Sequence, residues 1–556
     1  MKRAAVQQGL VHHDPDVDAI YRLLHADQNT GLDVKFNKFA SPITLSVGTY
    51  SPWNSQNTLF HKSAFHTLFL PTTVSFRTTD IWRSFISQKI LHLSGLTVSF
   101  VPTNAVQFRN AHDYLKDFKD EKQVYEDSGK MIEFLHNWKC LNGTLEECIY
   151  KLLTDLVAEN LWGEEDLKLM RMFLSDLKTL GFIFPKIIKN RYIDPYSPST
   201  NETTRDVNCR RINLEFDLVD PREYEQQKLN YFGHLVKWCN ESGYPTKSFP
   251  SPEQLEEQHA DTYVLQKDLN SVLILVNNYP WKYGMGLLQR LYQPYFAAVI
   301  FCGPWYPEQF QNDNYTSLVH PVNYIHFNPA ENHRGYFCYH CMTLVKEMGL
   351  QNVEGYFFVA DDTVFNMWQR IDYSRVSHFT GLPAAKNIVK KVKNSTDVKV
   401  KKAWKHFEDG LRKYGYINSS QTAEDELLAK RGKSISDFFY IPTSESDYYA
   451  TLMRVFYKNK FFLELAVNAF LKSVHHQTSN AALKSSLWGG DRNKWDSLYN
   501  RDMIGLHPVK MSQFKNPGEN RKRYCASVLQ TFSDIIFGGS RNFTVKADND
   551  PDHKNG

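Results

Sequence analysis

Apolar residues in the second half of the chain occur in short continuous runs, the pattern of strands buried on both faces of a sheet. Three such runs cover residues 272–276, 297–302 and 355–360. The intervening segments 281–293 and 337–348 are helix candidates. Strands that alternate with helices indicate a parallel sheet with crossover helices. We therefore predict an α/β fold in which these three strands are neighbours.

Helical spacing of apolar residues is clearest between residues 144 and 180. Thr144, followed three residues later by Glu147, predicts a capping box at the start of a helical pair. Polar stretches with several prolines indicate connections between folded parts. The pattern predicts an incomplete first domain at 1–185, a linker region at 186–261, a second α/β domain at 262–540 with a charged helical insertion at 386–433, and a disordered tail at 541–556.

Composition supports folded domains and argues against one class of partner. Of the 556 residues, 42% are hydrophobic and 14% aromatic, which is enough for packed cores. The chain has 65 basic and 61 acidic residues, a balance that does not indicate a nucleic-acid binder. We find no apolar run of about 20 residues, the length that spans a bilayer. Seven Asn-x-Ser/Thr sequons favour a lumenal compartment weakly.

The eight cysteines leave their chemistry open. Cys338 and Cys341 have the CxxC spacing, but no second CxxC follows. Buried thiols or a structural disulfide would account for them, and a zinc or redox site is the alternative.

Asp361 and Asp362 follow directly after the third predicted strand. Ligands of open parallel sheets bind beyond the carboxyl ends of the strands. Two adjacent carboxylates there suit a hard divalent cation, Mn²⁺ or Mg²⁺, which can neutralise a departing diphosphate. The alternative is a loop or helix-capping role before residues 364–368.

Three further residues of the second half are candidates. Glu464 lies within the apolar run 461–467, and a carboxylate in apolar surroundings suits a general base. His507, in front of a proline, can complete a metal site, and Lys510 can pair with phosphate. A surface helix for Glu464 and an ordinary loop for the other two are the alternatives.

Long strings of the first half resemble one known family, the STELLO-type glycosyltransferases. These strings run from Gln7 to about Cys140 and include QQGLVHHDPDVDAIYRLL, GTYSPWNSQNTLFHKSAF, LPTTVSFRTTDIWRSFISQKIL, VPTNAVQFRNAHDYLKDFKDE and IEFLHNWKC. The second half resembles the C-terminal region of the animal branch of that family more loosely, through GYFFVADDTVFNMW, FFLELAVNAF and GLHPVK.

The resemblance implies a GT-A-like fold, a nucleotide-sugar donor such as a UDP-sugar, and a glycan or protein acceptor. It also implies a location in the Golgi lumen and one membrane anchor near the N-terminus. In family members the first nucleotide-binding strands, with an acidic motif, precede the stretch that begins here at Gln7. We therefore expect Met1 to be a truncated start and residues 1–140 to contain an incomplete sheet, with the anchor upstream of this chain.

The first half retains candidates of its own, and the two halves are predicted to be related modules. Asp80 opens a helix and is a candidate general base, with an N-cap role as the alternative. Asn54, Gln56 and Asn57 are polar side chains of the kind that bind sugars, or else turn formers. His112 is a candidate metal ligand.

Two functions compete at this point. The first is a metal-dependent glycosyltransferase that uses a nucleotide sugar. The second is a non-catalytic Golgi organiser, in which a glycosyltransferase-like fold binds other enzymes or glycans. A sugar mutase is a third possibility, for which no residue can be assigned. If Asp361, Asp362 and His507 converge in the fold, the arrangement favours the enzyme.

Overall fold

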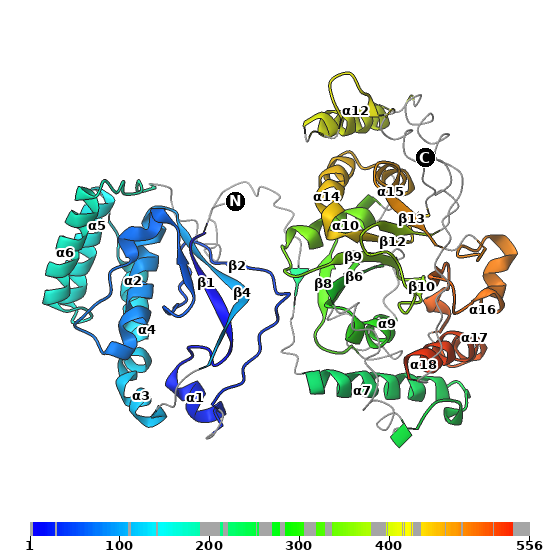
Figure 1. Cartoon of the computed structure of the whole chain (residues 1–556), viewed down its shortest axis with the longest axis horizontal. Helices are drawn as coiled ribbons and strands as arrows, with labels where there is room; N and C mark the ends of the chain where they lie inside the picture. Colours follow the sequence, from blue (N-terminus) through cyan, green and yellow to red (C-terminus); the bar gives the residue numbers. More distant parts are fainter. Residues whose placement is uncertain are drawn as a thin grey trace, which may run out of the picture. The chain divides into compact units, whose positions relative to one another are not determined.

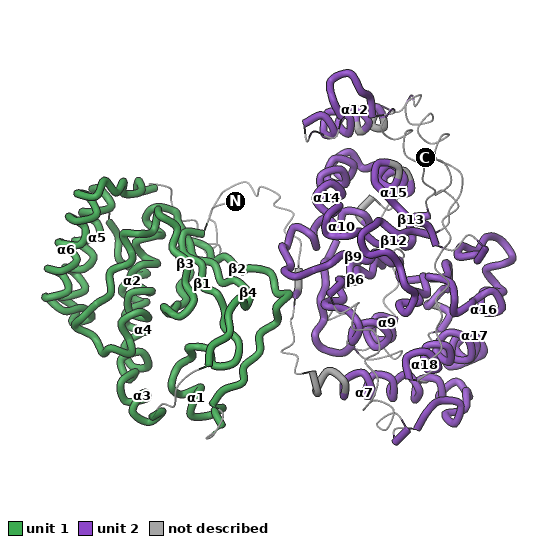
Figure 2. The backbone as a smooth tube through the Cα atoms, viewed as in Figure 1, with its two compact units in different colours: residues 1–207 green, residues 208–556 purple. Residues whose placement is uncertain are grey.

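The computed structural model divides the chain into two compact units, residues 1–207 and 208–556 (Figure 2). The structure describes residues 4–27, 31–108, 113–140, 143–188, 212–214, 221–251, 253–254, 270–277, 284–304, 318–327, 336–379, 396, 398–413, 415, 417–423, 425, 435–461, 463–479, 482–514 and 516–537. Among these residues, no helix is long and apolar enough to cross a membrane.

Unit 1 contains a four-stranded sheet in the order β2-β4-β1-β3. The central strands β1 and β4 are parallel, and the short edge strands are antiparallel to them. Helices α2, α4, α5 and α6 contribute most of the unit's main apolar cluster. The elements are β1 Ala4–His13, α1 Ala19–His25, β2 Ile43–Thr44, β3 Thr58–Phe60, α2 Thr79–Leu93, β4 Thr97–Gln107, α3 Tyr114–Asp120, α4 Lys122–Asn137, α5 Leu145–Ala158 and α6 Glu164–Thr179.

The predicted helical pair and its capping box are present in unit 1. The side chain of Thr144 accepts a hydrogen bond from the Glu147 amide, and the Glu147 carboxylate accepts one from the Thr144 amide. Two donors that the first turn of α5 leaves without helical partners are thereby satisfied. The helix boundary is therefore set by local chemistry that the sequence makes visible.

A buried histidine of unit 1 lacks polar partners. His66 is 0% exposed, and neither of its ring nitrogens has a hydrogen-bond partner among the described residues. Its ring centroid lies 5.8 Å from that of Phe182 and 6.2 Å from that of Phe184. Burial disfavours the charged imidazolium and lowers the pKa of His66 to about 4.

We expect unit 1 to lose stability as the pH falls from 6.5 to 4. The pKa of His66 is lower in the folded state, so the unfolded chain binds this proton more tightly, and acid favours unfolding. Above about pH 6.5, His66 makes its full contribution to the free energy of unfolding. By pH 4, roughly 3 kcal/mol of this contribution is lost. Hydrogen exchange of unit 1 amides against pH measures it, with His66→Leu as the comparison. An unchanged pH dependence in the variant would contradict the assignment.

Unit 2 is built on an eight-stranded sheet in the order β13-β11-β12-β9-β6-β7-β8-β5, and the α/β fold class is confirmed. Strands β6, β7, β8, β9, β11 and β13 share one direction, while β5 and β12 run against it. The strands are β5 Ile212–Asn213, β6 Ser271–Val276, β7 Ala298–Gly303, β8 Asn323–His326, β9 Gly355–Ala360, β11 Val376–His378, β12 Phe438–Pro442 and β13 His476–Thr478. The three runs predicted to be neighbouring strands are β6, β7 and β9, and they lie side by side.

Helices cover both faces of this sheet (Figure 1). Helices α10, α14 and α15 lie on one side of the strands in the view, and α7 and α9 lie on the other. The latter side contains the largest apolar cluster, which includes Leu275, Phe301 and Phe357 of three adjacent strands. The helices are α7 Pro221–Asn240, α9 Met285–Tyr292, α10 Tyr336–Glu347, α12 Val398–Lys413, α14 Thr443–Lys458, α15 Leu463–Lys472, α16 Trp495–Leu498, α17 Glu519–Tyr524 and α18 Gln530–Ile536. Helix α12 lies within the charged insertion predicted at 386–433, of which the structure describes residues 396, 398–413, 415, 417–423 and 425.

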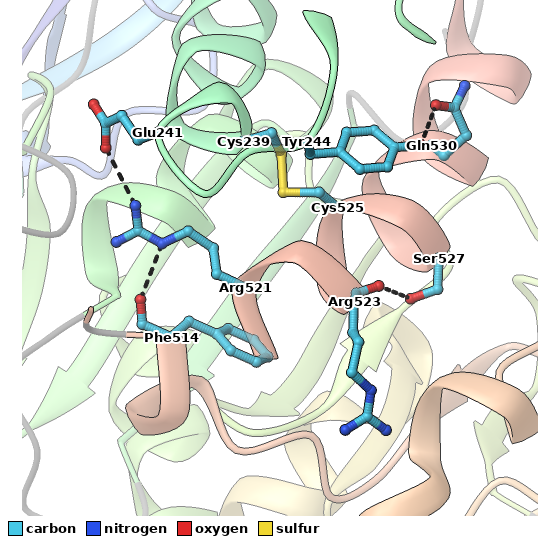
Figure 3. Close-up of a disulfide and its surroundings, with 9 residues drawn as sticks. All are labelled: Cys239, Glu241, Tyr244, Phe514, Arg521, Arg523, Cys525, Ser527 and Gln530. Carbon is cyan, nitrogen blue, oxygen red and sulfur yellow. Dashed lines mark hydrogen bonds and ion pairs between the residues drawn. A yellow bond between two sulfur atoms is a disulfide. The ribbon is translucent and has the colours of Figure 1, made fainter. Parts of the chain in front are cut away.

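Helix α7 and strand β5 lie within the stretch 186–261 that the sequence pattern assigns to connections. Polar residues dominate α7, but Phe232, Leu235 and Trp238 recur at three-residue steps and are buried in the main cluster. A disulfide joins Cys239 at the end of α7 to Cys525 in the short π-helix Cys525–Leu529 (Figure 3). Unit 2 thus includes a segment whose packing depends on residues almost 300 positions away.

Side chains around this disulfide reinforce the same junction (Figure 3). Arg521 is 1% exposed, and its guanidinium lies 4.6 Å from the ring centroid of Trp238. It donates to the Glu241 carboxylate at 3.2 Å and to the Phe514 carbonyl at 3.2 Å. A buried guanidinium needs such partners, because an unpaired one would be strongly destabilising. The C-terminal helices are thereby held against α7.

The remaining disulfides show how the cysteines of the CxxC motif are bonded. Cys341 on α10 is joined to Cys302 on β7, and Cys338 is a buried thiol that is not part of a disulfide. The two cysteines of the motif therefore do not pair with each other. In unit 1, Cys140 is joined to Cys148.

Candidate functional site

The candidate site lies at the carboxyl end of β9, where Asp361 and Asp362 form a turn. The Asp361 amide donates to the Val276 carbonyl at 3.0 Å, which continues the ladder to β6. The Thr363 amide donates to the Ala360 carbonyl at 2.9 Å and closes the turn. Asp361 and Asp362 are 2% and 5% exposed. Both carboxylates are therefore fixed next to the ends of the central strands.

A two-stranded sheet brings a distant segment to this turn. Strand β10, Val364–Phe365, follows the turn and pairs antiparallel with β14, Gly505–Leu506. A Cβ atom on Gly505 would lie 2.5 Å from the Val364 carbonyl oxygen, so only glycine allows this close approach. The Val509 amide donates to the Asp362 carbonyl at 2.6 Å. Residues 505–510 are thereby held against the acidic turn.

His507 and Lys510 both contact Asp362. Nε2 of His507 lies 3.2 Å from Oδ1 of Asp362, and the ammonium of Lys510 is paired with Oδ2. The His507 amide donates to the Ser485 carbonyl at 2.9 Å, and its carbonyl accepts from the Leu487 amide at 2.7 Å. The structure thus brings together three residues that the sequence predicts separately, across about 145 positions.

Asp437 completes the cluster, although it is not among the residues predicted from the sequence. It directly precedes β12, and its carbonyl accepts the Ala360 amide at 2.9 Å. Its Oδ2 lies 3.5 Å from Nδ1 of His507. An antiparallel strand begins where its parallel neighbour ends, so a residue in front of β12 arrives at the end of β9. An aspartate directly before the apolar run 438–442 is the only local signal for it.

The pKa values of Asp362, His507 and Asp437 depend on their neighbours in this cluster. Burial opposes ionisation of Asp362, but the hydrogen bond from His507 and the charges of His507 and Lys510 outweigh it and lower its pKa to about 2. Burial opposes the charged form of His507 too, yet the hydrogen bond to Asp362 and the Asp437 charge raise its pKa. Burial raises the pKa of Asp437, and the charges of Asp362 and Glu464 add to it while His507 opposes it. Asp362 is therefore a permanent anion, and Asp437 binds a proton more tightly than an ordinary aspartate.

Glu464 lies on a surface helix, which is the alternative that the sequence left open for it. It lies in the first turn of α15 and is exposed, whereas Leu463, Val467 and Phe470 of the same helix are buried. Helical periodicity separates neighbours in sequence onto different faces, so an apolar run does not bury every member. Glu464 is nevertheless close enough to Asp437 to affect its protonation.

Asp80, one of the residues predicted in unit 1, makes a local structural contact in the fold. The Asp80 carboxylate, in the first turn of α2, accepts the Ser55 amide at 2.8 Å. The N-cap position is taken by Thr78. Asp80 therefore anchors the loop before β3 to α2.

The three polar residues of that loop bind the backbone and side chains around β1. Nδ2 of Asn54 donates to the Asp16 carbonyl at 2.9 Å, and Oε1 of Gln56 accepts the Asp16 amide at 2.9 Å. Nδ2 of Asn57 lies 2.6 Å from Oδ1 of Asn104. Their role toward a sugar stays a prediction, as does that of Asp80. His112 lies outside the described residues.

The donor chemistry of the site fits a divalent cation. Asp361, Asp362 and Asp437 offer carboxylate oxygens, which suit Mn²⁺ or Mg²⁺, and His507 offers an imidazole nitrogen once it is deprotonated and turned from an aspartate. Among the residues that the structure describes, no group of three or more His, Cys, Asp or Glu side chains is already arranged around one ion position. Oδ2 of Asp362 is paired with Lys510, and Oδ1 lies 3.2 Å from Nε2 of His507. Binding of an ion by Asp362 therefore requires Lys510 to turn away.

Comparison of the sequence with models of known protein families identifies the family of this chain. A family model described as STELLO glycosyltransferases matches residues 77–438, which is more than half of the chain. The chain belongs to the STELLO glycosyltransferase family. The match includes Asp361, Asp362 and Asp437, while His507 and Lys510 lie beyond it.

Two members of the STELLO family from Arabidopsis thaliana are similar to the chain. It is 24% identical over 375 residues to a protein named "Probable glycosyltransferase STELLO1", which covers 67% of this chain and 42% of that protein. It is 22% identical over 526 residues to one named "Probable glycosyltransferase STELLO2", covering 91% of this chain and 61% of that protein. The chain thus spans less than two thirds of the length of either relative.

Proposed function

We propose that unit 2 is a glycosyltransferase that binds a nucleotide sugar, a UDP-sugar in the first instance, at the carboxyl end of β9. The observation that carries the proposal is the contact of Asp362 with both His507 and Lys510, beside Asp437. Membership of the STELLO family supports the reaction class. The acceptor is a glycan or a protein, as the family resemblance implies.

The position in the sheet supports a nucleotide ligand. Strands β6, β7 and β8 follow one another toward one edge, and β9 returns to the other side of β6. The order of the strands therefore reverses between β6 and β9, and open parallel sheets bind ligands at such a switch point. Asp361 and Asp362 lie directly at it.

Each residue has a role that its surroundings suit. Mn²⁺ or Mg²⁺ held by Asp361, Asp362 and His507 would stabilise the negative charge of the departing diphosphate. The ammonium of Lys510, which is half exposed, is free to turn from Asp362 to a phosphate oxygen. Asp437 is the candidate general base toward an acceptor hydroxyl, because burial raises its pKa. Glu464, predicted for this role from the sequence, is exposed and lies near Asp437.

The disulfides support a compartment of the secretory pathway. Three disulfides form within the described residues, and such bonds persist in oxidising compartments. We propose the Golgi lumen, with a membrane anchor that belongs to the longer family architecture.

One observation favours the alternative function, a non-catalytic organiser. The charge of Asp362 is already neutralised by His507 and Lys510, so the cluster is self-sufficient as a structural element. In that case the sheet edge would position the segment around β14 and bind no nucleotide.

Calorimetric titration of the chain with UDP- and GDP-sugars tests the proposal, with Mn²⁺, with Mg²⁺ and with a chelator. We expect at least one UDP-sugar to bind in the micromolar to millimolar range when Mn²⁺ or Mg²⁺ is present, and more weakly with the chelator. If no nucleotide sugar binds under any condition, the organiser is the better account.

A further inference from the structure

Four parallel strands end at the same level at the carboxyl edge of the main sheet. The ladder pairs Gly303 at the end of β7 with His326 at the end of β8. Asn277, the residue after β6, lies next to Gly303, because Val276 pairs with Cys302 and the Asn277 amide donates to the Cys302 carbonyl at 2.8 Å. On its other side is Asp361, whose amide donates to the carbonyl of Val276. Asn277 therefore occupies the switch point itself.

The carboxamide of Asn277 is buried and has an unused acceptor. The residue is 5% exposed, and its Oδ1 has no hydrogen-bond partner among the described residues. Buried polar atoms of folded proteins are nearly always paired, so an unpaired one at a strand end points to a missing ligand. The neighbouring strand β7 has a glycine, Gly303, beside this carboxamide. A Cβ atom at that position would lie only 3.2 Å from Oδ1, so the glycine keeps the carboxamide uncrowded on this side.

The side chains along this edge of the sheet follow the same order as the parts of a nucleotide sugar that they would bind. From β12 to β6 the edge presents Asp437, the acidic turn with Lys510, and then Asn277. A nucleotide sugar presents its sugar, its diphosphate and its nucleoside in that order. Adjacent strands lie about 4.8 Å apart, so the edge from β12 to β6 spans roughly 10 Å, and β7 and β8 add roughly another 10 Å beyond Asn277 for the nucleoside.

An acceptor oxygen cannot pair with a phosphate, which offers only acceptors itself. Oδ1 of Asn277 requires a donor, and the nucleoside half supplies two kinds, the ring N–H of a base such as uracil and the hydroxyls of the ribose. We propose that Asn277 binds the nucleoside half of the donor nucleotide through a hydrogen bond accepted by Oδ1. This inference rests on the proposed function and assigns the residue that distinguishes a nucleotide from a bare diphosphate.

The test compares UDP with inorganic diphosphate as ligands of the full chain, by calorimetry in the presence of Mn²⁺. The variants are Asn277→Ala and Asn277→Leu, the second of which keeps the branched shape of the side chain without its polar atoms. Ser271→Ala is the matched control, because Ser271 is also buried on β6 with an unpaired oxygen, but at the opposite end of the strand. Thermal melting checks that each variant is folded.

We expect both Asn277 variants to bind UDP about tenfold more weakly than the parent chain and to bind diphosphate as before. The Ser271 control should change neither affinity. Two analogues of UDP then identify the hydrogen-bond donor: one is methylated at the ring nitrogen, and the other lacks the 2′-hydroxyl. The analogue that lacks the true donor should bind the parent chain more weakly than UDP does. The Asn277 variants should not weaken the binding of that analogue further.

Three outcomes would overturn the inference. Unchanged UDP affinity in a folded Asn277 variant excludes the contact and leaves the proposed function standing. An equal loss for UDP and diphosphate shows that Asn277 supports the phosphate site or the fold instead. If the parent chain binds neither ligand, the proposed function fails, and this inference fails with it.

Discussion

Replacement of Asp361 and Asp362 together by asparagine is expected to reduce Mn²⁺-dependent UDP-sugar binding at least about a hundredfold. Asparagine keeps the shape of each side chain but removes the charge that attracts a divalent cation. It also removes the anion that holds His507 and Lys510 in place. Calorimetry with the best ligand of the nucleotide panel measures the effect. A loss of one preorganised charge-stabilising group typically costs a hundredfold or more in transfer rate, so activity should fall at least as far as binding.

The control for this double variant is Asp496→Asn. Asp496 is also an ion-paired aspartate of unit 2, bound to Arg523, but it belongs to α16 and not to the acidic turn. Its replacement should leave nucleotide binding unchanged. Undiminished binding by a folded Asp361/Asp362 variant would show that the acidic turn is not the metal site, and would favour the organiser.

Removal of the disulfide between Cys239 and Cys525 is expected to cause the largest loss of stability. This bond closes a segment of 286 residues, whereas the bond between Cys140 and Cys148 closes one of 8. In the chain-entropy model, the longer closure contributes about 5.5 kcal/mol to the free energy of unfolding and the shorter about 2.5 kcal/mol. The double variant Cys239→Ala/Cys525→Ala should therefore unfold at a much lower denaturant concentration.

Denaturant unfolding, with hydrogen exchange to assign the loss to a unit, compares this variant with Cys140→Ala/Cys148→Ala. We expect the first variant to weaken unit 2, in which α7 would lose its covalent tie to the C-terminal helices. The second should weaken unit 1 by about half as much. Equal losses, or a larger loss for the short loop, would mean that contacts such as those of Arg521 hold the junction without the disulfide.

Local patterns in the sequence were sufficient for three central strands and for the acidic turn. The runs at β6, β7 and β9 are continuous and apolar because these central strands are covered on both faces, which makes them visible without a structure. Asp361 and Asp362 follow one of these runs directly, so their place at a strand end could be predicted. The capping box at Thr144 is similarly a short-range signal.

Residues whose role depends on strand order could not be predicted in this way. Asp437 reaches the site only because β12 runs antiparallel to β9, and Asn277 is next to Asp361 only because β9 returns beside β6. No pattern of spacing encodes either fact. Helix α7 was not predicted, because its apolar stripe is narrow and most of its residues are polar. Glu464 lies within an apolar run but is exposed, so the run alone could not decide between its buried and surface alternatives.

A crystal structure of the chain with UDP and Mn²⁺, using the anomalous scattering of manganese, tests the central claim most directly. The account predicts a manganese peak within bonding distance of an oxygen of Asp361 or Asp362, with the diphosphate on the metal and Lys510 turned from Asp362 toward a phosphate. A manganese–nucleotide complex bound elsewhere in the chain, with Lys510 still paired to Asp362, would contradict it.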